Sequence, residues 1–118
     1  MMFICYPKCT TCQKARRWLD DHGVDYTIRD IKTDNPSLEE LRSWYSTAGQ
    51  PIKRFFNTSG LLYKSLGLKD KLGSMSEDET LELLSTDGML VKRPIIVEGS
   101  TVLIGFSETQ WKQALVKN

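Results

Sequence analysis

The sequence has no long hydrophobic run and almost no net charge. Its 118 residues carry 16 Lys and Arg against 15 Asp and Glu, for a formal net charge of +1. Such a balance gives no electrostatic reason to expect direct contact with nucleic acid or an anionic membrane surface. No apolar stretch approaches the roughly 18 residues that a membrane-spanning helix needs. The first residues also lack the basic start and the cleavage site of a signal peptide, so we expect a cytoplasmic protein.

Metal-ligating residues are also scarce. The chain has three cysteines and one histidine, and only Cys9 and Cys12 have the spacing of a zinc half-site. Such a site needs two more ligands, whereas Cys5 is predicted inside a strand and His22 at the far end of the following helix. Structural disulfides are rare in a reducing compartment. We therefore predict no metal and favour redox or nucleophilic chemistry for the CxxC pair.

The CxxC pair lies at a predicted junction between a strand and a helix. The apolar run Phe3-Ile4-Cys5-Tyr6 is long enough for a buried strand, and helical spacing of apolar residues begins near Ala15. Cys9 is thus predicted in the connecting turn, and Cys12 within about the first helical turn. The positive end of a helix favours a thiolate, and Lys8 and Lys14 add positive charge nearby. Cys5 is interpreted as a small buried hydrophobe.

The order of the predicted elements is βαβ, then helices, then ββα. Gly23 is a plausible helix C-cap, and the segment 24–31 reads as a second, parallel strand. Capping boxes at Ser37 with Glu40 and at Ser76 with Glu79 predict helices to about Thr47 and about Ser85. Between them, residues 52–56 indicate a short extended or helical connector, residues 61–66 a short helix, and residues 69–71 a solvated turn. Gly99-Ser100 predicts a hairpin between residues 95–98 and 101–104, and a last helix follows Ser107.

Together these elements predict an α/β fold of the thioredoxin-like (glutaredoxin-like) type. One domain over 1–118 would hold a four-stranded mixed sheet, with a helical insertion at about 35–88 between its halves. The CxxC pair would lie at the carboxyl end of the first strand, where open α/β sheets place their chemistry. Arg93-Pro94 opens the third strand. In this fold a cis Pro94 would bring Arg93 close to Cys9, whereas without the fold Lys92-Arg93 is a solvated basic turn.

Four motifs resemble the family of small arsenate-reductase-like, glutaredoxin-fold proteins that includes the Spx transcription regulators. The resemblance covers essentially the whole chain. Its motifs are Tyr6-Pro7-Lys8-Cys9-Thr10-Thr11-Cys12 with Lys14-Ala15, Leu62-Tyr63-Lys64-Ser65-Leu66-Gly67-Leu68, Lys92-Arg93-Pro94-Ile95-Ile96-Val97 and Val102-Leu103-Ile104-Gly105-Phe106.

The resemblance implies three alternative functions. Arsenate reductases of this family use one nucleophilic Cys, matched by Cys9, and three arginines, of which Arg93 matches one. Asn57 and Gly105 stand where the other two would align, and neither supplies the bidentate bonds that hold an oxyanion. Cys12, which oxyanion chemistry of this type does not need, points instead to intramolecular disulfide exchange. The third alternative is an Spx-like sensor that binds RNA polymerase.

The resulting hypothesis is a thiol–disulfide oxidoreductase in which Cys9 attacks and Cys12 resolves. Lys8, Thr10, Thr11, Arg93 and Pro94 are the candidate substrate-binding or supporting residues, and residues 57–59 are expected to line the cleft opposite Cys9. We expect no tightly bound cofactor. A thioredoxin- or glutaredoxin-type protein, glutathione or another small thiol would return the pair to its reduced form.

Overall fold

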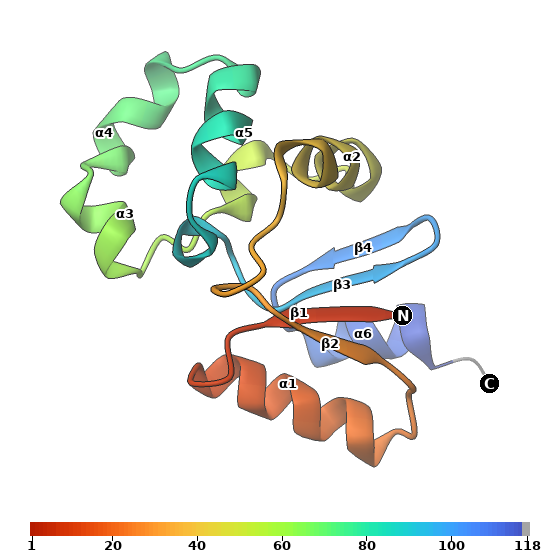
Figure 1. The fold of residues 1–118 in the computed structure, drawn as a ribbon. Helices are drawn as coiled ribbons and strands as arrows, with labels where there is room; N and C mark the ends of the chain where they lie inside the picture. The colour runs from red at the N-terminus through yellow and green to blue at the C-terminus, as the bar shows by residue number, and fades with distance from the viewer. Residues whose placement is uncertain (117–118) are drawn as a thin grey trace.

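The fold alternates strands and helices around one sheet (Figure 1). The computed structural model describes residues 1–116; the last two residues of the predicted domain, 117–118, lie outside the described residues. The strands are β1 (Met2–Cys5), β2 (Thr27–Asp30), β3 (Ile95–Glu98) and β4 (Thr101–Ile104). The α-helices are α1 (Thr10–Asp21), α2 (Leu38–Ala48), α3 (Leu61–Ser65), α4 (Leu68–Lys71), α5 (Glu77–Ser85) and α6 (Glu108–Leu115). Short 3-10 helices occupy η1 (Ile52–Phe55), η2 (Leu72–Ser74) and η3 (Gly88–Leu90).

The sheet has four strands in the order β2-β1-β3-β4. Strand β1 pairs in parallel with β2 and antiparallel with β3, and β3 forms an antiparallel hairpin with β4. The mixed sheet, the βαβ unit and the terminal ββα unit are therefore confirmed. Because β1 is a central strand, the turn that leaves its carboxyl end begins in the middle of the molecule.

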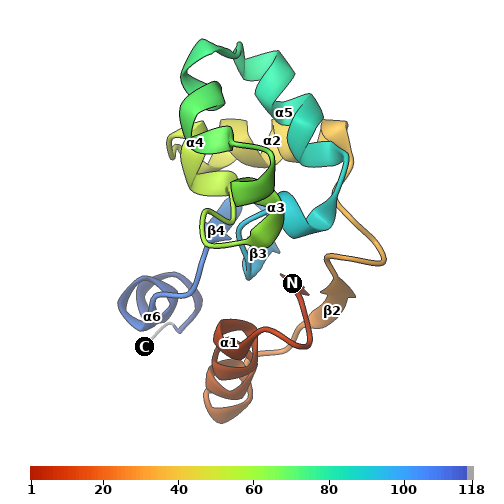
Figure 2. The same cartoon turned by 90° about the vertical axis from the view of Figure 1, so that its left-hand side faces the viewer.

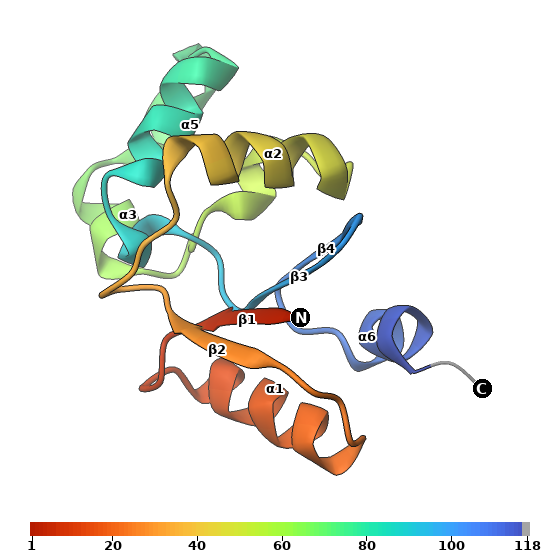
Figure 3. The ribbon, with the colours of Figure 1, turned by 45° about the vertical axis from the view of Figure 1, so that its right-hand side comes forward.

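The two faces of the sheet are covered by different helices. Helices α1 and α6 lie on one face, whereas α2 and the group α3–α5 lie on the other, as Figures 1 and 2 both show. The side chains of β1 point alternately to the two faces of the sheet and so contribute to both cores. Phe3 and Cys5 pack into the core with Ala15 and Trp111, and Ile4 packs into the opposite core with Trp44. In Figure 3 the helices α2 and α1 lie on opposite sides of the sheet.

Local capping signals determine the helices of the intervening segment. Both predicted capping boxes are present: Ser37 accepts from the amide of Glu40, and Ser76 accepts from the amide of Glu79. Each satisfies amide groups that the first helical turn leaves free. No helix in the described residues 1–116 has the length and apolar character needed to cross a membrane.

Two predicted boundaries are wrong. The second strand begins at Thr27 instead of residue 24, because the amide of Val24 donates to the carbonyl of Leu19 and so belongs to the end of α1. Residues 69–71, predicted as a turn, lie in α4, which begins after Gly67 at a left-handed φ of 64°. The burial of Leu68 explains this helical turn, because its side chain packs into the core that also contains Tyr63 and Leu84.

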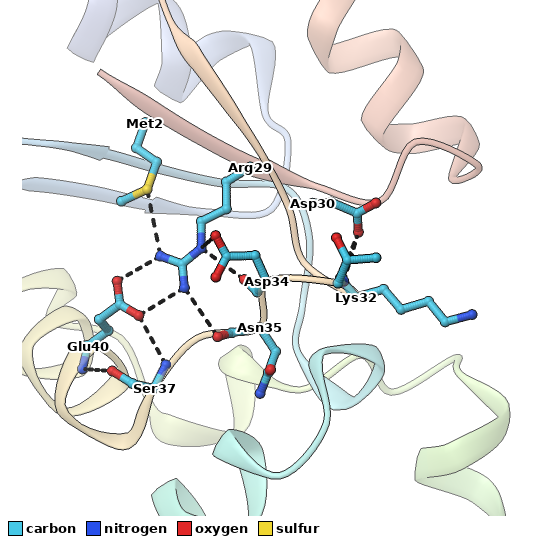
Figure 4. Close-up of polar contacts among 9 residues, drawn as sticks. Met2, Arg29, Asp30, Lys32, Asp34, Asn35, Ser37 and Glu40 are labelled. Carbon is cyan, nitrogen blue, oxygen red and sulfur yellow. Dashed lines mark hydrogen bonds and ion pairs between the residues drawn. The ribbon is translucent and has the colours of Figure 1, made fainter.

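Arg29 connects the sheet to the segment that begins α2 (Figure 4). Its guanidinium donates to both carboxylate oxygens of Glu40, at 2.7 and 2.9 Å, and to the carbonyl oxygens of Asp34 and Asn35. Glu40 also accepts from the amide of Ser37. Bidentate, charge-assisted contacts of this kind fix direction as well as distance. Arg29 therefore sets how the chain leaves β2 and enters α2.

This contact predicts an acid-dependent loss of stability. The Arg29 guanidinium lowers the pKa of Glu40 from 4.5 to about 2. The unfolded chain therefore binds the proton more tightly, so the contribution is present above about pH 4.5 and is lost as the pH falls toward 2. Because about a third of the Glu40 side chain is exposed, solvent screens the contact, and we expect a contribution of ~1–2 kcal/mol.

Glu40→Gln, which keeps an acceptor for the capping box, should lower the free energy of unfolding by this amount at pH 7. Urea unfolding at pH 7 and pH 3 measures it. The difference from the native chain should shrink at pH 3, and Glu39→Gln, on the same helix, is the control. A difference that does not change with pH would contradict the assignment.

Candidate active site

The turn between β1 and α1 places Cys9 at the N-cap of α1. Cys9 has extended backbone angles, its amide donates to the carbonyl of Tyr6, and no side chain caps the helix. The first turn contains no acidic residue, so no carboxylate competes for its free amide groups. Cys9 therefore lies at the positive end of the helix.

Cys12 is the buried partner of this turn. It is only 2% exposed, and its Sγ accepts a hydrogen bond from the amide of Tyr6 at 3.3 Å. It packs in the same core as Cys5 and lines a small cavity with it, and Cys9 packs against the edge of that core. The interaction with Cys5, and then burial, raise the pKa of Cys12 well above its ordinary value. Cys9 is half-buried, and all three cysteines are free thiols.

The opposite side of the site comes from the segment before β3. The peptide bond between Arg93 and Pro94 is cis, and the Pro94 carbonyl accepts from the amide of Gly105 at 2.8 Å. The guanidinium of Arg93 lies over the ring of Tyr6, 5.1 Å from its centroid. Tyr6 therefore contacts Arg93 through its ring and Cys12 through its amide, and it joins the two halves of the site.

Cys9 opens into a cavity of about 580 Å³. The cavity is walled by residues from three separate parts of the chain: Cys9, Thr11, Asn57, Ser59, Gly60, Leu61, Leu62, Asp87, Met89, Lys92 and Arg93. Two of them, Lys92 and Arg93, are cationic. Asp87 is the one acid among them, and its carboxylate accepts from the amide of Met89. The cavity thus combines an apolar wall with a net positive charge beside a thiol.

The structure brings together some of the residues predicted for the site and leaves others outside. Thr11 and Arg93 line the cavity with Cys9, whereas Lys8 and Thr10 are exposed and are not part of its wall. Pro94 is buried behind Arg93. Of residues 57–59, the first and last line this cavity, while Thr58 lines a neighbouring one.

Sequence reasoning missed the apolar wall and the contact between two thiols. Leu61 and Met89 carry no chemical signal, and only the folded chain places them opposite Cys9. Cys5 is buried as predicted, but it also shares a core and a small cavity with Cys12. The alternation of β1 contained a signal for this contact, because it places Cys5 on the face that α1 covers. Among the described residues, no group of three or more His, Cys, Asp or Glu could hold a metal ion.

Comparison with known proteins identifies the family. The model of the ArsC family matches residues 5–114. The chain belongs to the ArsC family. The uncharacterized protein YusI of Bacillus subtilis is 50% identical to it over 113 residues, which are 96% of each chain. A crystal structure of an ArsC family related protein from Bacteroides fragilis is 49% identical, covers 95% of this chain and 94% of its own, and superimposes with a TM-score of 0.93.

Regulators are also among the relatives of this ArsC-family chain. The regulatory protein MgsR of Bacillus subtilis is 32% identical over 107 residues, which are 91% of this chain and 83% of its own. This chain, which carries the CxxC pair, is therefore similar to regulatory proteins as well as to the ArsC family related protein. The assignment to the ArsC family settles the fold and the thiol chemistry at the level of the family, and the choice of substrate rests on the cavity.

The position of Arg93 predicts a preference for anionic reagents at Cys9. Arg93 lines the same cavity as Cys9, and a full charge placed across such a partly solvated cavity contributes about 1 kcal/mol, or roughly fivefold in rate. Arg93→Ala should therefore slow alkylation of Cys9 by iodoacetate by about fivefold relative to neutral iodoacetamide. Mass spectrometry of the Cys9 peptide over time measures both rates.

The charge-matched control is Arg54→Ala. Arg54 lines a neighbouring cavity and is not part of the wall around Cys9. This variant should leave the ratio of the two rates close to that of the native chain. Equal effects of the two substitutions would show that net charge, rather than the position of Arg93, sets the preference.

Proposed function

We propose that this chain is a thiol–disulfide oxidoreductase in which Cys9 is the attacking thiolate and Cys12 the resolving thiol. The observation that carries the proposal is the difference between the two cysteines. Cys9 is half-buried at a helix N-terminus and borders a cavity of about 580 Å³, whereas Cys12 is 2% exposed. A substrate can therefore reach Cys9 but not Cys12.

The first step is attack on a disulfide substrate. The Cys9 thiolate bonds to one sulfur of the substrate, the substrate S–S bond breaks, and the other half leaves as a thiolate. The raised pKa of Cys12 keeps it protonated at neutral pH and so unsuited to this step. Cys9 then carries a mixed disulfide that faces the cavity.

Cys12 completes the transfer. After it loses its proton, its sulfur attacks Cys9 Sγ, the mixed disulfide breaks, and the substrate thiolate leaves. The amide of Tyr6, which donates to Cys12 Sγ, stabilises the negative charge that this step needs. An external dithiol or glutathione then reduces the Cys9–Cys12 disulfide and restores both thiols.

The cavity wall supports an anionic thiol or disulfide as substrate. Arg93 and Lys92 supply positive charge, Asn57 and Ser59 supply hydrogen-bonding groups, and Leu61 supplies apolar surface. Glutathione has this combination of carboxylates and peptide groups. We therefore propose glutathione or a similar small thiol as co-substrate, with Thr11 and Arg93 as binding residues and Lys8, Thr10 and Pro94 in supporting roles.

The geometry gives less support to arsenate reduction. Gly105, where the resemblance aligns a second arginine, has a φ of +77°, a backbone conformation that disfavours residues with a side chain. The side chain of Asn57, at the other aligned position, packs on Gly60. An oxyanion beside Cys9 would therefore meet one arginine and one lysine, with none of the further bidentate donors that tight binding requires.

A redox sensor is the second candidate, and the similarity to the regulatory protein MgsR favours it. The same Cys9–Cys12 pair would then change the affinity for a protein such as RNA polymerase after one oxidation. Repeated turnover separates the two functions. An enzyme consumes many equivalents of disulfide when a reductant is supplied, whereas a sensor consumes one.

Trapping with glutathione disulfide tests the roles of the two cysteines. Cys12→Ser should accumulate glutathione on Cys9, because no thiol remains beside it to release the adduct. Cys9→Ser, the matched variant, should lose turnover by at least about 100-fold, since its buried Cys12 remains protonated. Intact-mass and peptide mass spectrometry report the adduct, and a coupled reductant assay reports turnover. Glutathione found on Cys12 in the native chain would reverse the roles.

A further inference from the structure

A third thiol lies beside the CxxC pair and has no part in the mechanism above. Cys5 is the last residue of β1 and is 2% exposed. It points to the face that α1 covers, together with Phe3, and packs in the same core as Cys12 and Ala15. A buried cysteine in a strand is usually a small hydrophobe, so its surroundings decide whether it has a further role.

Cys12 lies between the other two thiols. It packs in the same buried core as Cys5, and Cys9 packs against the edge of that core. The Tyr6 amide that donates to Cys12 Sγ belongs to the residue directly after Cys5. The end of β1 and the first turn of α1 therefore bring Cys5 and Cys12 into one core, and the Tyr6 amide connects the end of the strand to Cys12.

A second, smaller cavity borders the same two thiols. Its volume is about 60 Å³, and its wall consists of Cys5, Pro7, Cys12, Gln13, Arg16 and Ile28. This is space for about two water molecules, at ~30 Å³ each in the liquid, so a thiol beside it has room to change rotamer. The pKa of Cys5 is lowered first by a hydrogen bond from the Cys12 thiol, which is lost once Cys12 is in a disulfide, and then by the positive charge of Arg16, which remains. Cys5 therefore has the space and the charge that a reactive thiol needs.

We propose that Cys12 has two disulfide partners, and that Cys5 is a second resolving thiol that moves the disulfide from Cys9–Cys12 to Cys5–Cys12. The Cys5 thiolate attacks Cys12 Sγ, the Cys9–Cys12 bond breaks, and Cys9 leaves as a thiolate that takes up the proton lost by Cys5. The total oxidation state of the protein is unchanged, so the step needs no external oxidant or reductant.

The direction of this exchange follows from the position of the leaving sulfur. A thiolate leaves a disulfide more readily when it is more stable, and Cys9 lies at the positive end of α1. The exchange would return Cys9 to a free thiol while the protein remains oxidised. The chain could then hold one disulfide in its core and keep its attacking thiol available. This step rests on the proposed function, because Cys9–Cys12 must form first.

The order of protease sites makes the two disulfides easy to distinguish. Trypsin cleaves after Lys8 and Lys14, which leaves Cys5 in the peptide 1–8 and both Cys9 and Cys12 in the peptide 9–14. A Cys5–Cys12 disulfide links these two peptides, whereas a Cys9–Cys12 disulfide lies within the second. Peptide mass spectrometry under non-reducing conditions, after free thiols are blocked, therefore reads the pairing directly.

The test compares Cys9→Ser with Cys12→Ser after oxidation with diamide, a small oxidant that converts two thiols to a disulfide. The two variants each keep Cys5 and one cysteine of the CxxC pair. Cys9→Ser should yield at least about tenfold more of the linked peptide 1–8/9–14, because Cys12 lines the smaller cavity with Cys5 and Cys9 does not. Equal or lower yield from Cys9→Ser, in protein whose circular dichroism shows that it is folded, would overturn the proposal.

A second readout follows the released Cys9. The native chain and Cys5→Ala, a substitution that leaves the CxxC pair intact, are each oxidised by one equivalent and treated with iodoacetamide while folded. Cys9 should be alkylated in a measurable fraction of the native chain and remain blocked in Cys5→Ala. Identical blocking in both would show that the exchange does not occur.

The experiment distinguishes a failure of this proposal from a failure of the proposed oxidoreductase function. A native chain that forms neither disulfide would refute the oxidoreductase mechanism. A native chain that forms Cys9–Cys12, together with a Cys9→Ser variant that forms no Cys5–Cys12 link, would refute only the role of Cys5.

Discussion

One turn of helix separates Cys9 from Cys12, and the site depends on the different surroundings that this turn gives the two thiols. Cys9 ends the turn from β1 and opens into the large cavity, while Cys12 lies three residues later on the buried face. The face that Cys12 shares with Ala15 packs against β1, so the core of the sheet fixes the inner thiol. Cys9, the more exposed of the two thiols, lies at the N-terminus of α1. The packing of α1 on the sheet therefore determines which of the two thiols is buried and which is accessible.

The remaining parts of the site are held to this turn by a few specific contacts. The segment before β3 pairs with the end of η1, where the amide of Lys92 donates to the carbonyl of Phe55 at 2.7 Å. The amide of Asn57 donates to the carbonyl of Leu90 at 2.8 Å. Gly88 packs so closely on the carbonyl of Ile31 that a side chain would overlap it. These backbone contacts place the far wall of the cavity opposite Cys9.

Features encoded by neighbouring residues could be predicted from the sequence. The βαβ unit, both capping boxes and the Gly99-Ser100 hairpin depend on residues within a few positions of one another, and all are present. The same holds for Cys9 in the turn and Cys12 in the first helical turn, whereas the burial of Cys12 was not predicted. Signals of this kind involve only residues that are close together in the sequence.

Features that depend on packing between distant segments could not be predicted. The second strand was predicted from residue 24, yet Ile28 is 41% exposed, so burial of this strand's apolar side chains does not set its length. Leu61 and Met89 form the wall opposite Cys9 only because the helices between the two strand pairs pack together. The neighbouring thiols of Cys5 and Cys12 are seven positions apart, and their contact requires α1 to lie on β1. Sequence periodicity gives the face of each element but not the partner it meets.

The measurement that tests the central claim most directly is a redox titration of the native chain in glutathione buffers. Rapid alkylation at each potential, followed by mass spectrometry, gives the fraction of Cys9 and Cys12 that is oxidised. The account predicts a reversible disulfide involving Cys12, with a potential in the range of about −180 to −320 mV that thiol–disulfide systems of reducing compartments span. Cys9 that reacts alone, while Cys12 stays a thiol at every potential, would contradict it.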